Sequence, residues 1–188
     1  MNIMTVGVDG GNNEVKLYGE NGAMKFSSLI GEYRERKLES KFSEDDIVFE
    51  YNGRKGFAGT LAQFESEFSA SRKGDSKAHE DFLLRVLIGL HRYAEETNFN
   101  IIVGQPINKH INSEKVKMRT LLTGSHEITV NDMKKDITIH RTEVAAEGAT
   151  AFFSNTKSGL VRILDFGSGT VNAGTLYDGK YIDRDSFS

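Results

Sequence analysis

The stretch "RILDFGSGTVNAG" (residues 162–174) joins the end of an apolar strand to an unusual turn. Ile163 and Leu164 lead directly into a carboxylate, Asp165. A tight hairpin uses glycine where its backbone needs positive φ, but it requires neither an acid at the end of the strand nor hydroxyl groups beside the glycines. We therefore interpret the turn as a binding loop, formed by Gly167, Ser168, Gly169 and Thr170.

A second turn of the same kind lies near the start, in "TVGVDGGNNEVKLY" (residues 5–18), where an apolar strand ends at Asp9. Backbone N–H groups in glycine-rich loops can surround an anion closely, and amide and hydroxyl side chains add donors. A carboxylate does not bind phosphate directly, but it can hold hydrated Mg²⁺ beside phosphate oxygens. We expect Asp9 and Asp165 to hold Mg²⁺ through water. The phosphate-binding residues expected in this first turn are Gly10, Gly11, Asn12 and Asn13.

Two further residues could take part in phosphate chemistry. Glu147 stands in "TEVAAEGATAFF" (residues 142–153), where we expect a helix over about 143–156. It is either an exposed acid favoured by the helix dipole or the carboxylate that orients or deprotonates the water attacking a terminal phosphate. Lys16 follows the first turn, and it either reaches a β- or γ-phosphate as a point charge or faces solvent.

The order of expected elements is that of an α/β protein, with strands at both ends and helices between. The charge-dense segment of about 30–78 is interpreted as an inserted subdomain whose charges form a solvated face. Apolar residues recur at helical spacing in 79–97. Asn-Gly, Asn-Asp and Asp-Gly pairs predict hairpin turns at 52–53, 131–132 and 178–179. The other expected elements are strands at 3–9, 12–18, 22–29, 99–106 and 160–165, hairpin arms at 170–177 and 180–187, and a helix from 112 or 113 to 124.

Composition narrows the class of protein. The chain has 188 residues, a net charge of −3 and no cysteine, which excludes disulfides and thiolate metal sites. Binding to a nucleic-acid backbone depends on clustered Lys and Arg, so we expect no direct nucleic-acid partner. The start "MNIMTVGVDG" lacks the features of a secretory signal, and no stretch is apolar for the length of a membrane span. We expect a cytoplasmic protein with no membrane partner.

Other phosphate-binding motifs do not fit. "GTLYDGKY" (174–181) has the glycine and lysine spacing of a Walker A loop, but Tyr181 stands where Ser or Thr is required and no helix follows. The glycines of both turns lead into strands, whereas a dinucleotide-binding fingerprint leads into a helix. The two turns therefore indicate a different type of phosphate site.

The motifs resemble those of a known family. Asp9 to Asn12 with Lys16 resembles the first phosphate loop of the actin superfamily, in the form found in bacterial plasmid-segregating actin-like proteins of the ParM/StbA type. "LDFGSGT" (164–170) resembles their second phosphate loop, and "VAAEGATAFF" is similar to the segment that carries their catalytic Glu, which maps to Glu147. "IIVGQPIN" (101–108) is similar to the strand and loop that close the sheet of their first domain.

The resemblance implies an RNase H-like fold: an α/β domain with a mixed five-stranded sheet flanked by helices, plus the beginning of a second like domain. The corresponding domains are 1–159, with the insertion at about 30–78, and 160–188. It further implies Mg-ATP, or GTP, bound in an interdomain cleft, with Glu147, Asp165 and Asp9 as catalytic residues. Family members assemble into filaments that segregate plasmid DNA through a DNA-binding adaptor of the ParR type.

The chain departs from the family pattern in two places. Asn172 stands where members often carry Asp or Thr, and the glycine-rich adenosine loop that members carry later is absent. We therefore expect an N-terminal part whose ATPase activity alone is weak or missing. Two alternatives stay open: a small-metabolite kinase of the sugar or acetate type in the same superfamily, and a non-catalytic structural module whose glycine turns are only turns.

Overall fold

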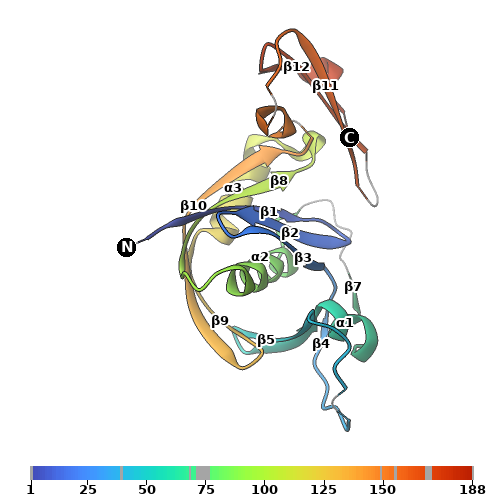
Figure 1. Cartoon of the computed structure of the whole chain (residues 1–188), viewed down its shortest axis with the longest axis vertical. Helices are drawn as coiled ribbons and strands as arrows, with labels where there is room; N and C mark the ends of the chain where they lie inside the picture. The colour runs from blue at the N-terminus through green and yellow to red at the C-terminus, as the bar shows by residue number, and fades with distance from the viewer. Residues whose placement is uncertain are drawn as a thin grey trace.

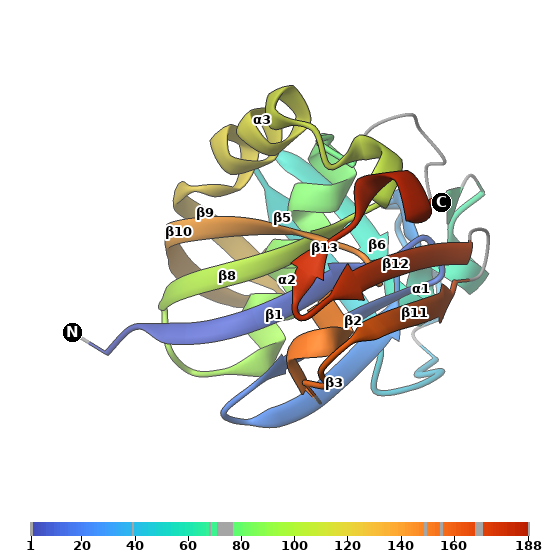
Figure 2. The same ribbon diagram turned by 90° about the horizontal axis from the view of Figure 1, so that it is seen from above.

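The computed structural model describes residues 2–38, 40–67, 69–70, 77–148, 150–154, 156–167 and 171–187. The described strands form a ten-stranded sheet and a separate three-stranded sheet. Figure 1 shows the smaller sheet at one end of the molecule, and Figure 2 views the molecule from that end. No helix in the described ranges is long and apolar enough to cross a membrane.

One end of the larger sheet is the mixed five-stranded unit that the resemblance implies. β1 (Met4–Gly10), β2 (Glu14–Gly19) and β3 (Gly22–Ser27) pair as antiparallel neighbours. β8 (Asn98–Gln105) lies parallel to β1, and β10 (Met133–Ala146) lies parallel to β8. The order β3-β2-β1-β8-β10 brings the carboxyl ends of β1, β8 and β10 to one edge of the sheet.

The inserted segment extends this sheet. β9 (Gly124–Val130) forms a hairpin with β10, and β5 (Asp46–Tyr51) pairs with β9. β6 (Arg54–Ala58), β4 (Ile30–Glu32) and β7 (Ser69–Ala70) follow outward in that order. The predicted hairpins at 52–53 and 131–132 are confirmed, with positive φ at Asn52, Gly53, Asn131 and Asp132.

Two helices cover one face of the larger sheet around β1 and β10. α2 (Glu80–Tyr93) lies in the curve of the sheet and packs on β1, β2, β9 and β10, and α3 (Asn112–Leu122) packs on β10 beside α2. α2 ends four residues before the predicted end, where Lys135 Nζ donates to the carbonyl oxygens of His91 and Ala94. A short helix, α1 (Gly59–Glu65), packs on the inserted strands, and a 3-10 turn (η1, Ile107–Lys109) precedes α3.

The prediction of a helix over 143–156 is wrong. β10 continues to Ala146 because residues 143–146 pair in register with β8, from Glu143 beside Ile102 to Ala146 beside Gln105. The stretch is rich in alanine but has no apolar stripe to dock as a helix, so the sheet ladder satisfies its backbone instead. Among the described residues of 147–156, a 3-10 turn (η2, Thr150–Ser154) follows.

The smaller sheet consists of β11 (Leu160–Phe166), β12 (Val171–Tyr177) and β13 (Lys180–Tyr181). Its predicted turn at Asp178 and Gly179 is confirmed, and both residues have positive φ. The second arm is shorter than expected: β13 ends at Tyr181, a 3-10 turn (η3, Asp183–Asp185) follows, and Phe187 pairs with Ala173 through an isolated bridge.

Acidification is expected to weaken the fold through His91. Burial lowers the pKa of His91 below its ordinary value of 6.5, and nearby Lys135 lowers it further, although a backbone hydrogen bond to Met133 and the charge of Glu95 oppose the shift. The folded state therefore takes up this proton less readily than the unfolded chain, so the contribution is full above about pH 6.5 and is lost as pH falls below it. Urea unfolding at about pH 7.5 and pH 5.5 should show a larger loss for wild type than for His91→Asn. Equal losses would contradict the assignment.

Candidate functional site

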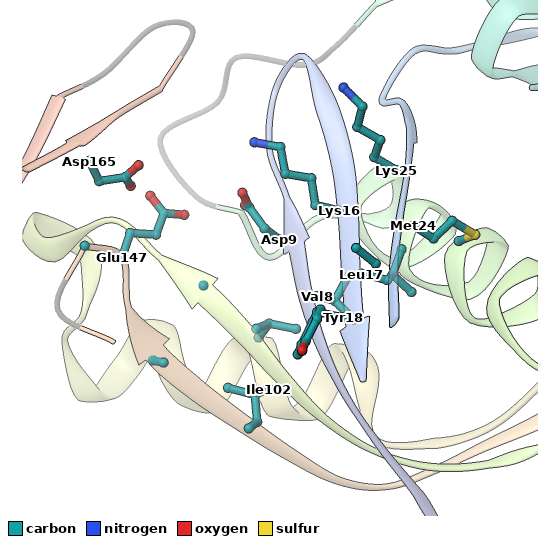
Figure 3. A pocket seen from close by; sticks show the side chains of 16 residues that line it. Val8, Asp9, Lys16, Leu17, Tyr18, Met24, Lys25, Ile102, Glu147 and Asp165 are labelled. Carbon is teal, nitrogen blue, oxygen red and sulfur yellow. The ribbon is translucent and has the colours of Figure 1, made fainter. Parts of the chain in front are cut away.

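The first predicted turn and the described residues that lead into the second lie at the walls of the same space. Two adjoining cavities, of about 710 Å³ and 290 Å³, share Asp9, Lys16, Glu147 and Asp165. Figure 3 shows the carboxylates of Asp9, Glu147 and Asp165 pointing toward one another from three different segments. The acids at which the two predicted turns begin, Asp9 and Asp165, therefore line the same space.

Strand pairing sets these positions. Asp9 lies near the end of β1 and pairs with Lys16 of β2. Glu147 directly follows β10, where its N–H donates to the Gln105 carbonyl oxygen at the end of β8. A Cβ at Gly104 would lie 3.1 Å from Glu147 Cγ, so this glycine leaves room for the Glu147 side chain. Glu147 is thus fixed by the edge of the sheet, and not by a helix N-terminus as expected.

The smaller cavity is the polar one. The first turn contributes Gly11, Asn12 and Asn13 to its wall, and Phe166, Gly167 and Asn172 come from the second hairpin. The larger cavity runs along the open face of β1, β2, β3 and β8, where its wall is largely apolar. The predicted residues Ser168, Gly169 and Thr170 lie outside the described residues.

Gly10 has a packing role that the motif alone did not predict. It is not among the residues lining either cavity, and neither Gly10 nor Gly11 has positive φ. A Cβ at Gly10 would lie 2.4 Å from Cε2 of Phe82, a fully buried residue of α2. The glycine therefore lets the first turn of α2 approach the end of β1.

Gly10→Ala is expected to destabilise the fold by about 1–3 kcal/mol, because the added methyl group overpacks the Phe82 ring. Gly7→Ala is the matched control on the same strand, since its added Cβ would meet only the Tyr18 carbonyl oxygen at 3.7 Å. Urea unfolding of both variants measures the difference. A Gly10→Ala midpoint equal to that of Gly7→Ala would show that the ring does not constrain this position.

Lys77 is a site residue that the sequence analysis missed. Its Nζ contacts Glu147 Oε1 and lies 3.9 Å from Asp9 Oδ1. Its side chain is 19% exposed and that of Glu147 is 15% exposed, so the ion pair is largely shielded from water. Lys77 lies in the segment interpreted as a solvated face. No motif marks it, and its partner is 70 residues away.

Asn172 connects the two sheets. It is 1% exposed, and its Nδ2 donates to Glu147 Oε2 and Asp165 Oδ2, both at 3.4 Å. Its Oδ1 is buried with no hydrogen-bond partner among the described residues. An unpaired acceptor at the wall of a polar cavity suits a ligand that can donate hydrogen bonds, such as the water molecules around a cation.

The acids of the site fit a cation that is held through water. In the part of the chain that the structure describes, no three His, Cys, Asp or Glu side chains lie close enough to ligate one ion directly. Mg²⁺ commonly keeps several waters and is held by one or two carboxylates together with phosphate oxygens. Asp9 and Asp165 on opposite walls of the polar cavity match that donor set.

Comparison with known proteins identifies the family. The model of the N-terminal domain of actin-like proteins matches residues 7–149. The chain belongs to the actin-like proteins. This match includes the first turn and Glu147, and it confirms the resemblance to the actin-like family.

Solved structures of actin-like proteins share the fold. An AlfA filament bound to AMPPNP is 24% identical, with a TM-score of 0.74 over 99% of this chain and 69% of that one. The apo pSK41 ParM protein is 22% identical, with a TM-score of 0.78 over 100% of this chain and 66% of that one. An archaeal actin homologue is 19% identical, with a TM-score of 0.81 over 98% of this chain and 61% of that one. No curated protein matches this actin-like chain in sequence.

Proposed function

We propose that this chain is the N-terminal part of a filament-forming ATPase that binds Mg-ATP between its two sheets. The observation that carries the proposal is that the acids of both motifs, Asp9 and Asp165, line one polar cavity together with Glu147. In this proposal, residues 1–159, with their insertion at about 30–78, form domain I, and 160–188 form the first strands of domain II. ATP is the expected nucleotide, with GTP as the alternative.

We assign one set of residues to holding the metal ion and another to binding the phosphates. Asp9 and Asp165 would hold Mg²⁺ through water, and Lys16 would supply positive charge toward the phosphates. When bound, Mg²⁺ offsets phosphate charge and aligns the terminal phosphate. The phosphate-binding backbone and side chains are proposed to be those of Gly10, Gly11, Asn12, Asn13, Gly167, Ser168, Gly169 and Thr170. Gly10 would act indirectly, by letting the turn pack on Phe82.

Glu147 is proposed to act on the attacking water. Its carboxylate faces the acids of both turns, and Asn172 holds one of its oxygens. A carboxylate placed beside the terminal phosphate can orient a water and accept its proton. Asp9 and Asp165 would contribute by positioning the phosphate for that attack.

The assembly proposal rests on the family and its solved relatives. Among structures of the same fold, AlfA is described as a filament bound to AMPPNP, and a ParM from Clostridium botulinum is described as a 15-stranded filament. We infer that the protein self-associates into filaments that segregate plasmid DNA through a ParR-like DNA-binding adaptor. The chain covers 69% and 66% of the AlfA and pSK41 ParM chains, so these activities are proposed for the full-length protein.

Two measurements test the function. Calorimetric titration with Mg-ATP and Mg-GTP reports nucleotide binding, and sedimentation of the full-length protein with and without nucleotide reports filaments. We expect saturable binding and nucleotide-dependent pelleting. Consumption of ATP only when a sugar or acetate is added would support the kinase alternative. No nucleotide binding would support the non-catalytic module.

A further inference from the structure

Positive charge is scarce in the polar cavity. Among the described residues that line it, Lys16 and Lys77 are the cations, whereas four lining residues are acids: Asp9, Glu14, Glu147 and Asp165. A triphosphate carries several negative charges of its own, and like charges repel strongly where water is partly excluded. Both ammonium groups must therefore face the phosphates for the anion to bind well.

Lys77 does not face an open anion site in this structure, because its ammonium group contacts Glu147 Oε1. While Oε1 accepts the hydrogen bond of the ammonium group, that side of the carboxylate is not open to a water molecule. The contact therefore occupies the group that the proposed function requires for catalysis.

The fold holds Lys77 where it can reach both acids and the phosphate turn. It lies two residues before His79, the N-cap of α2, whose Nδ1 accepts a hydrogen bond from the Phe82 N–H. Phe82 in turn packs on Gly10 at the first turn. The backbone beside Lys77 is thereby tied to the phosphate-binding end of β1, while a lysine stem has four flexible carbons that let Nζ change partner.

We propose that Lys77 is a terminal-phosphate contact that exchanges partners. Its Nζ binds Glu147 in the arrangement seen here, and it moves to the γ-phosphate of a bound nucleoside triphosphate, which frees Glu147 to face water. A terminal phosphate attracts the ammonium group more strongly than one carboxylate oxygen because it offers more charge and more acceptors. The inference rests on the proposed function and adds to it a residue that distinguishes a triphosphate from a diphosphate.

The test compares nucleotides in the full-length protein. Titration calorimetry with Mg-AMPPNP and Mg-ADP is carried out on wild type, Lys77→Met and Lys77→Arg. Lys77→Met should weaken AMPPNP binding by about 10- to 100-fold, as expected for the loss of one charge-assisted hydrogen bond, and ADP binding by less than about threefold. Lys77→Arg should recover most of the AMPPNP affinity because it keeps the charge.

The control is Lys134→Met, which also removes a lysine paired with a glutamate, Glu127, but on the exposed β9–β10 hairpin. It should bind both nucleotides as wild type does. Lys77→Gln is a second variant with the same expectation as Lys77→Met, and thermal unfolding verifies that each variant is folded. Equal losses for AMPPNP and ADP, or no loss, would overturn the role of Lys77 alone. A wild-type protein that binds neither nucleotide would overturn the proposed function as well.

Discussion

Glu147→Gln is expected to lower the ATP turnover of the full-length protein by about 10²–10⁴-fold, the range for loss of a general base. The amide keeps the size of the side chain and its fit over Gly104, but it cannot accept a proton from water. Mg-ATP binding should change little, because Asp9 and Asp165 are the proposed metal-holding acids. Filaments formed with ATP should persist longer than those of wild type, since hydrolysis no longer removes the terminal phosphate.

Phosphate release and sedimentation over time measure both effects. Glu143→Gln is the matched control: it lies four residues earlier on β10, and its half-exposed side chain pairs with Arg119 and Arg141. Its turnover should equal that of wild type. A Glu147→Gln protein with unchanged turnover and intact nucleotide binding would remove Glu147 from the mechanism.

Phe82→Ala is expected to lower the free energy of unfolding by about 3–5 kcal/mol. The ring is 1% exposed and fills the space between the first turn of α2 and Gly10. Deleting it leaves a cavity directly beneath the end of β1, which cannot collapse without moving Asp9 and the adjoining turn. We therefore expect weaker nucleotide binding together with the loss of stability.

Urea unfolding gives the stability change for Phe82→Ala, and Phe64→Ala provides the comparison. Phe64 of α1 is 57% exposed and packs against Phe42 at a ring distance of 5.0 Å. Its removal should cost less than about 1 kcal/mol. If the two variants lost the same stability, the contact between α2 and the first turn would not hold the site together.

Local turn chemistry is the part of the fold that the sequence predicts best. Asn52, Asn131 and Asp178 adopt positive φ where Asn-Gly, Asn-Asp and Asp-Gly pairs predict hairpins. These residues tolerate the left-handed region and need no distant partner to do so. The two acid-and-glycine turns were recognised for a similar reason, because each motif is complete within a short stretch.

Features that depend on partners far away in the sequence could not be predicted from local patterns. Residues 143–146 extend as a strand because β8 lies beside them, and a local reading of their alanines favoured a helix. Lys77 belongs to no motif, and only the fold places it against Glu147. Gly10 looked like a phosphate ligand, but its lack of a side chain serves contact with Phe82.

Because β5 pairs with β9, the strands of the inserted segment and the five-stranded unit of β3, β2, β1, β8 and β10 belong to one continuous sheet. Asn131 N–H donates to the Val48 carbonyl oxygen at this junction, and the continuous pairing lets the larger sheet move as one unit. The described strands of the smaller sheet share no ladder with it. A turn of one sheet against the other would break no ladder among the described strands, but it would strain the hydrogen bonds from Asn172 to Glu147 and Asp165.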